Sequence, residues 1–149
     1  MEARAVSVRP QPWRWSRPRV LIEHPDEAAG LAIASGLRLA GYAVAVCPGP
    51  HEQGQCPLTG PEGCITARDA DLVVGCLGYE DAVAQEVLHA LRARCPDVPL
   101  VVELPAGVST DWAGRLDDCR VLAAPATPEQ IVAAARELLG TLGEGREGA

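Results

Sequence analysis

The sequence lacks phenylalanine, and aromatic residues make up only 3% of its 149 residues. Its hydrophobic share of 48% is almost entirely alanine, valine, leucine and isoleucine, small side chains that suit helices packed closely on a parallel sheet. No apolar run approaches the roughly 20 residues of a membrane-spanning helix, and the N-terminal region lacks the apolar core of a signal peptide. We therefore expect a cytoplasmic protein whose six cysteines are reduced rather than paired in disulfides.

Positive charge is also scarce. The net charge is -7 and the sequence pI is about 4.9, which disfavours a nucleic-acid partner because phosphate binding requires clustered Lys or Arg. Several arginines nevertheless gather near the N-terminus, namely Arg4, Arg9, Arg14, Arg17 and Arg19. We expect residues 1–18 to form a disordered basic arm, with Trp13 and Trp15, that precedes an acidic body.

Motifs of the common enzyme classes are missing as well. The segment Gly75–Gly78 has neither the lysine nor the spacing of a phosphate-binding loop, and there is no G-x-S-x-G sequence. Cys76 and His24 would make a nucleophile and base pair only if a third group oriented the histidine, and no such group is evident. We therefore expect a protein that is not an enzyme.

The chain does contain short apolar runs that alternate with helical patterns. The runs are continuously apolar, which is typical of parallel strands covered on both faces. They occupy residues 19–23, 42–47, 71–76, 99–104 and 120–124. Helical spacing of apolar residues indicates helices at 27–40, 81–95, 110–119 and 128–139.

Local signals support these helix ends. Asp26 and Asp81 stand where N-cap residues belong, and Gly41 stands where a helix is followed by a glycine. Thr127 and Gln130 have the spacing of a capping box.

The connection between the second and third strands is unusual. Residues 48–70 hold four prolines and four glycines without apolar periodicity, so at most one short helix fits, around Glu62–Arg68. A Cys/Pro/Gly-rich loop thus largely replaces the second helix. Right-handed crossovers then give a single flavodoxin-like, doubly wound α/β domain over residues 19–139, with a five-stranded parallel sheet in the order 2-1-3-4-5. Residues 140–149 are expected to form a flexible tail.

At the level of strand spacing, the chain resembles the receiver domain of bacterial response regulators. The resemblance covers about residues 19–139 and includes the turn LAGYAVAVC, the fourth strand PDVPLVVEL and the late segment VLAAPATPEQI. It implies a signalling domain that binds other proteins and that can form a homodimer through the last helix and strand, here including Ile131–Leu139.

Receivers carry an acidic pair that holds Mg²⁺, an aspartate that accepts the phosphoryl group, a Thr/Ser and a lysine. At the matching positions this chain has His24 and Pro25, then Cys76, then a residue near Leu104, then Ala124. Phosphoryl transfer depends on positioning and on charge neutralisation by the metal and the lysine. The resemblance therefore implies a degenerate pseudo-receiver that lacks the phosphorylation site.

Four cysteines and two histidines fall near the strand ends on one side of the predicted sheet, where doubly wound domains bind ligands. The thiols Cys47, Cys56, Cys64 and Cys76, with His24 or His51 as a further ligand, suit Zn²⁺ or an iron–sulfur cluster, although their spacing matches no standard metal motif. A reversible redox switch is a second reading, and it requires an accessible thiol of low pKa, for which Cys76 is a candidate. A third is that the thiols are structural, as we expect for Cys95 and Cys119.

We therefore expect a non-catalytic receiver-like signalling or interaction domain with an unidentified protein partner, and with a cysteine cluster that gates it. The alternative is a metal-binding or thiol redox-sensing protein that uses the cysteines between 47 and 76.

Overall fold

The computed structural model describes residues 17–50, 56–107, 116 and 119–148. Its strands are β1 (Arg19–Glu23), β2 (Ala43–Cys47), β3 (Leu72–Gly75), β4 (Leu100–Leu104) and β5 (Arg120–Ala123). Its helices are α2 (Glu27–Leu39), the 3₁₀ turn η2 (Pro57–Thr59), α3 (Ile65–Asp69), α4 (Ala82–Arg94) and α5 (Pro128–Gly148).

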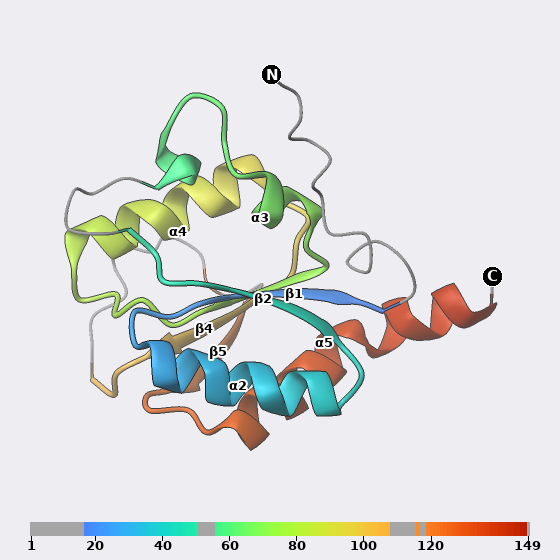
Figure 1. Ribbon diagram of the computed structural model, residues 1–149. Coiled ribbons are helices and arrows are strands. Elements are labelled where there is room, and N and C mark those ends of the chain that lie inside the picture. The colour runs from blue at the N-terminus through green and yellow to red at the C-terminus, as the bar shows by residue number, and fades with distance from the viewer. Residues whose placement is uncertain (1–16, 51–55, 108–115, 117–118, 149) are drawn as a thin grey trace.

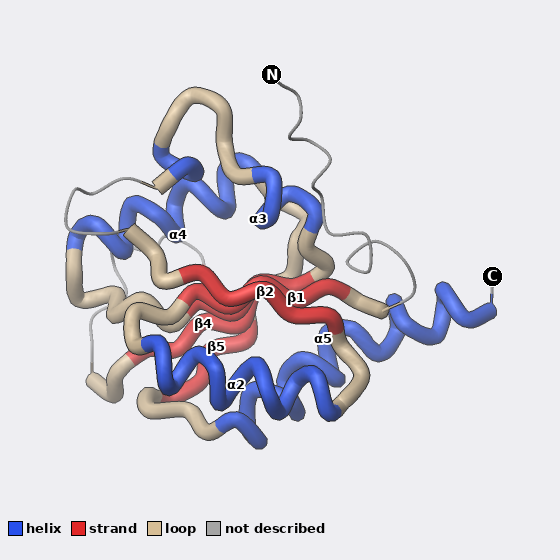
Figure 2. The backbone as a smooth tube through the Cα atoms, in the orientation of Figure 1, coloured by secondary structure: helices blue, strands red, loops and turns tan. Residues whose placement is uncertain are grey.

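The five strands form one sheet in the order β2-β1-β3-β4-β5, and every neighbouring pair is parallel. Helices α2 and α5 cover one face, and α3 and α4 cover the other (Figures 1 and 2). The predicted flavodoxin-like architecture and strand order are thus confirmed. Because all strands run the same way, their carboxyl ends share one edge of the sheet.

Each face of the sheet has its own hydrophobic core, because successive strand residues point to opposite sides. On β1, Val20 and Ile22 pack toward α2 and α5, whereas Leu21 packs toward α4. The last residue of β1, Glu23, follows the same alternation and faces the α4 side. This alternation decides which side chains meet at the edge of the sheet.

The predicted helix ends are also present. The side chain of Asp26 accepts the Ala29 N–H at 3.2 Å, so it caps α2. Asp81 caps α4 in the same way. Gly41, just beyond α2, has a φ of 105°, a left-handed conformation that glycine adopts without strain.

The capping box of α5 is complete, with Thr127 Oγ1 accepting the Gln130 N–H at 3.1 Å and Gln130 Oε1 accepting the Thr127 N–H at 2.8 Å. α5 itself differs from expectation, because it continues to Gly148 rather than ending near Leu139. No helix in the described part of the chain combines the length and hydropathy that a membrane crossing requires.

The Cys/Pro/Gly-rich connection contains η2 and the one-turn helix α3, so it holds one short element more than expected. Leu58 of η2 and Ala67 of α3 are buried against the α4 side of the sheet. The basic arm before residue 17, His51, and most of the helix expected over 110–119 lie outside the described residues. The division of the chain into arm, domain and tail stays a prediction.

Candidate functional site

Three side chains meet at the carboxyl end of the sheet because the strand register places them in one row. Glu23 of β1 is paired with Gly75 of β3, and Gly75 is paired with Val102 of β4. One residue further along each strand stand His24, Cys76 and Glu103. Neighbouring residues on a strand point to opposite faces, so this row faces α2 and α5 while Glu23 faces α4.

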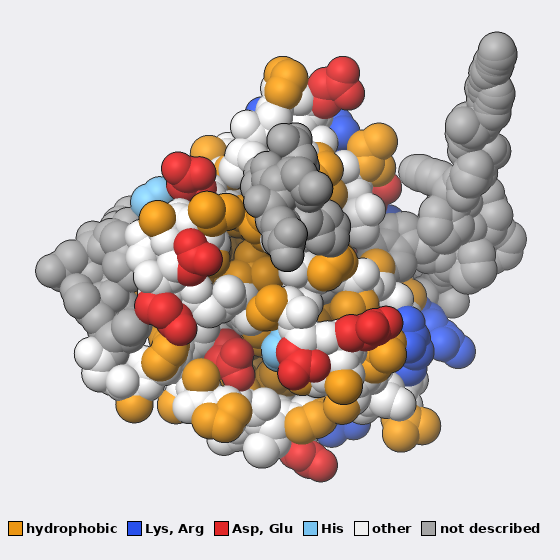
Figure 3. Space-filling view, turned by 60° about the vertical axis from the view of Figure 1, so that its left-hand side comes forward, with side chains coloured by type: hydrophobic (Ala, Val, Ile, Leu, Met, Phe, Trp, Pro, Cys, Tyr) orange, Lys and Arg blue, Asp and Glu red, His pale blue; other side chains and the backbone are white. Residues whose placement is uncertain are grey.

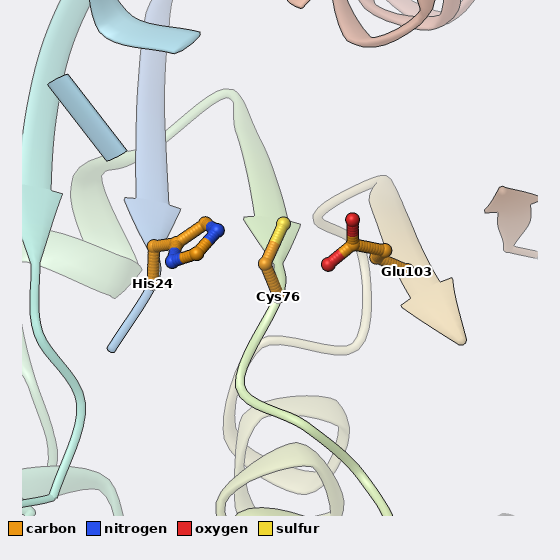
Figure 4. Close-up of side chains that lie close together, drawn as sticks. All are labelled: His24, Cys76 and Glu103. Atoms are coloured by element: carbon orange, nitrogen blue, oxygen red, sulfur yellow. The ribbon is translucent and has the colours of Figure 1, made fainter. Parts of the chain in front are cut away.

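The row brings an imidazole, a thiol and a carboxylate together. In Figure 4 the sulfur of Cys76 lies between the outer ring nitrogen of His24 and the carboxylate of Glu103. One ligand atom from each of these residues lies within 4.8 Å of the others. Cys76 is buried at 3% exposure, and the two flanking residues are half-buried. The row therefore combines a buried thiol with two partly exposed polar side chains that flank it.

Backbone groups hold the two flanking side chains in place. His24 Nδ1 accepts the Asp26 N–H at 3.0 Å, in the turn that leads into α2. Glu103 Oε2 accepts the Ala126 N–H at 2.7 Å, in the turn between β5 and α5. Both turns are fixed by helix caps, so the row is held in position by the starts of α2 and α5.

The thiol of Cys76 keeps its proton. Burial raises its pKa well above the ordinary value, and the Glu103 carboxylate raises it further, both by its charge and by accepting a hydrogen bond from the thiol. A reactive redox thiol requires the opposite, a lowered pKa. Cys76 is therefore not the low-pKa thiol that a redox switch requires, because it is buried and lies beside the negative charge of Glu103.

The other three predicted thiols lie on the opposite face. Cys47, Cys56 and Cys64 pack against the core on the α4 side, whereas Cys76 belongs to the core on the α2 side. All six cysteines are free thiols. The structure thus brings Cys76 together with His24 but separates it from the other three.

Cys47, Cys56 and Cys64 do form a loose group of their own. Burial is the main cause that raises the pKa of Cys47. The hydrogen bond from Gly49 lowers this pKa, and the charges of Glu23, Cys56 and Cys64 raise it further. The Gly49 N–H donates to Cys47 Sγ at 3.4 Å, and the Leu58 N–H likewise donates to the sulfur of Cys56. Cys95 is buried in the same core, in keeping with the structural role expected for it.

Glu23 is a buried carboxyl beside this group. It is 3% exposed, and within the described part of the chain its Oε1 has no hydrogen-bond partner. Desolvation raises its pKa to about 7. A Cβ atom at Gly75 would lie 2.3 Å from the Tyr79 hydroxyl oxygen and 3.8 Å from Glu23 Oε1. The lack of a side chain at Gly75 therefore leaves room for the Tyr79 hydroxyl group beside Glu23.

Sequence reasoning missed Glu103. The resemblance puts the receiver's hydroxyl position near Leu104, and Leu104 itself is buried in the core on the α4 side. The signal that would have found Glu103 is its place as the one polar residue in the run VVEL. Glu23 interrupts the run RVLIE in the same way, and both carboxyls lie near strand ends.

No protein-family model and no curated protein sequence matches this sequence. Solved structures do match. An orphan response regulator of H. pylori has a TM-score of 0.61 and 20% identity, over 83% of this chain and 98% of that chain. A CheY-like response regulator receiver domain protein from Methanospirillum hungatei has a TM-score of 0.60 and 16% identity, over 89% and 98% of the two chains.

A third match is a Burkholderia thailandensis protein assigned to pilus assembly, with a TM-score of 0.61 and 17% identity over 83% of this chain and 98% of that one. At such identities the likeness shows the fold and not the activity, and a fold can serve several functions. The chain has the fold of response-regulator receiver domains.

Proposed function

We propose that this chain is a non-catalytic receiver-like domain that takes up no phosphoryl group and acts by contact with a protein partner. One observation carries the proposal. The row His24, Cys76 and Glu103 stands at the strand ends where a phosphorylated receiver needs an acidic pair, an acceptor aspartate and a hydroxyl group.

The chemistry of this row disfavours phosphoryl transfer. The reaction depends on neutralising the charge of the transferred group with a metal ion and a cationic side chain. The row offers one carboxylate to a hard cation such as Mg²⁺, which prefers several oxygen ligands. Burial and Glu103 keep the Cys76 thiol protonated, and the thiol form is a poor nucleophile. The sequence contains no lysine at any position.

A small phosphodonor tests this proposal. We expect no change in the intact mass of the protein after incubation with acetyl phosphate and Mg²⁺. The matched variant is Cys76→Asp, which restores an acceptor carboxylate but neither the acidic pair nor the lysine, so we expect it to stay unmodified too. A phosphoryl group attached to the wild-type chain would contradict the proposal.

The surface supports a protein partner rather than nucleic acid. On the face shown in Figure 3, acidic side chains are scattered among hydrophobic ones, and arginine side chains gather at its edge. The chain as a whole has a net charge of -7. Exposed apolar side chains include Leu39 at 89% and Val121 at 42% exposure.

A homodimer through the last helix and strand stays part of the proposal, with one change. Ile131, Ala135 and Leu139 are buried against the sheet, so only the outer side of α5 and the exposed surface of β5 are available for it. Sedimentation equilibrium of the wild type and of Val121→Glu tests this. Dimerisation that Val121→Glu weakens supports it, whereas a monomer at every concentration leaves a different protein as the partner.

Thiol chemistry at Cys47, Cys56 and Cys64 is a second candidate function. It is favoured by the backbone N–H groups that point at two of the sulfurs, because such hydrogen bonds stabilise metal-bound or ionised sulfur. Zinc, an iron–sulfur cluster and a reversible disulfide are the candidates. A metal would have to draw the three sulfurs together, because they do not lie within 4.8 Å of one another in the described structure. Metal analysis of anaerobically purified protein, with thiol titration before and after mild oxidation, separates them. Unmodified thiols and no metal would leave the three residues as packing groups.

A further inference from the structure

The row His24, Cys76 and Glu103 consists of side chains that can hold a metal ion, whether or not a phosphoryl group binds there. We propose that His24, Cys76 and Glu103 bind one zinc ion through nitrogen, sulfur and oxygen, with a fourth position open to water or to a group from a partner. The proposal does not rest on the proposed function, because metal occupancy is measured directly.

The geometry needs little adjustment. The three ligand atoms lie within 4.8 Å of one another without a metal. Zinc bonds of about 2.0–2.3 Å in a tetrahedral arrangement put ligand atoms about 3.5 Å apart. Each pair therefore has to approach by little more than about 1 Å, which side-chain rotation supplies. The three strand ends already lie in a row, because β1, β3 and β4 follow one another in the sheet, so the remaining adjustment falls on the turn between His24 and Asp26.

The charges balance. A Cys76 thiolate and the Glu103 carboxylate carry two negative charges, and a neutral His24 carries none, so Zn²⁺ makes a neutral site. When zinc binds, the S–H bond of Cys76 breaks, a Zn–S bond forms, and one proton is released. The cation also offsets the repulsion that a Cys76 thiolate would otherwise meet from the Glu103 carboxylate, and the two side chains lie next to each other in Figure 4.

The ligand types select the metal. Imidazole and thiolate favour zinc over the hard cations Mg²⁺ and Ca²⁺, which take oxygen ligands. Glu103 is oriented by the Ala126 N–H on its Oε2, a second contact of the kind that metal ligands normally have. Among the described residues, Cys47, Cys56 and Cys64 do not come together within 4.8 Å as such a group.

His24 couples the site to α2. In the metal-free protein its Nδ1 accepts the Asp26 N–H, so the outer nitrogen Nε2 carries the proton of a neutral imidazole. Binding zinc through Nε2 moves that proton to Nδ1, and the hydrogen bond from Asp26 is lost. Zinc binding therefore changes the turn that begins α2, whose N-cap is Asp26 itself.

The test is a titration of metal-free, full-length protein with Co²⁺, followed by displacement with Zn²⁺. We expect one equivalent of Co²⁺ to give a thiolate-to-metal charge-transfer band, and Zn²⁺ to remove it. Cys76→Ser should abolish the band. Glu103→Gln and His24→Asn should each weaken zinc affinity by at least about 100-fold, at or above the top of the range seen for loss of second-shell groups. The amide signal of Asp26 should shift with zinc in NMR spectra of the wild type.

Matched controls are Cys47→Ser and Cys95→Ser, which should bind Co²⁺ as the wild type does. Circular dichroism verifies that each variant is folded, and Glu103→Gln decides the matter if Cys76→Ser does not fold. A band that persists in Cys76→Ser, or that disappears in Cys47→Ser, locates the metal elsewhere and overturns the proposal. Folded wild-type protein that gives no band also overturns it.

Discussion

Replacing Glu23 with glutamine tests whether a buried carboxyl at the end of β1 makes the stability of this protein depend on pH. Glu23 is 3% exposed, and burial raises its pKa to about 7 from the ordinary value of 4.5. Glutamine has nearly the same shape and does not titrate. The change therefore removes a proton equilibrium while leaving the packing nearly unaltered.

The sign follows from where the proton is bound. Between about pH 4.5 and pH 7 the folded protein holds the proton of Glu23, whereas the unfolded chain has released it. The stabilisation is therefore complete below the unfolded pKa and is lost as the pH rises through the folded pKa. A difference of this size amounts to roughly 2–3 kcal/mol between about pH 5 and about pH 8.

Urea unfolding of wild type and Glu23→Gln across this pH range measures the effect. We expect the free energy of unfolding of the wild type to fall relative to that of the variant as the pH rises, by roughly 2–3 kcal/mol. Other titrating groups affect both proteins alike and cancel in the difference. If the free energies of unfolding of wild type and variant differ by a constant amount over the whole pH range, burial does not raise the pKa of Glu23 and the reasoning is refuted.

Three further changes test neighbouring parts of the structure. Gly75→Ala places a methyl group 2.3 Å from the Tyr79 hydroxyl oxygen, so we expect a loss of about 1–3 kcal/mol in urea unfolding, and unchanged stability would contradict the close approach. Thr127→Ala removes the acceptor of the Gln130 N–H and should cost about 1 kcal/mol, whereas Thr127→Ser should cost much less. Cys76 should react with iodoacetamide more slowly than the half-buried loop thiols, and a faster reaction would exclude its raised pKa.

The fold was predictable because its signals are local. Continuous apolar runs identify parallel strands, and the cap residues Asp26, Asp81 and Thr127 mark helix starts through hydrogen bonds to N–H groups a few residues away. Chain connectivity and handedness then leave few strand orders. The end of α5 was less predictable, because no strong stop signal follows Leu139 and Gly140 alone does not end the helix.

The division of the cysteines between two faces was not predictable. It depends on two registers. That of β2 against β1 pairs Cys47 with Glu23, and that of β3 against β1 pairs Gly75 with Glu23, so Cys76, one residue further, faces the opposite side. A shift of one residue in that pairing would have placed Cys76 with the loop thiols. Register is set by packing across the whole sheet, and a single sequence does not reveal it.

Glu103 was missed for a related reason. A glutamate inside an apolar strand is visible in the sequence. Only the register of β4 against β3, which pairs Val102 with Gly75, shows that Glu103 lies beside Cys76. The resemblance to phosphorylated receivers implies a hydroxyl group near this position, whereas the chain has the carboxylate of Glu103 there.

The central claim is that His24, Cys76 and Glu103 lie where receivers accept a phosphoryl group, and that this chain does not accept one there. NMR spectra of the full-length protein, recorded with Mg²⁺ alone and then with Mg²⁺ and beryllofluoride, a phosphoryl mimic, test it most directly. The account predicts that the amide signals of His24, Cys76 and Glu103 stay unchanged in both additions. Saturable shifts of these three signals that require beryllofluoride would contradict it.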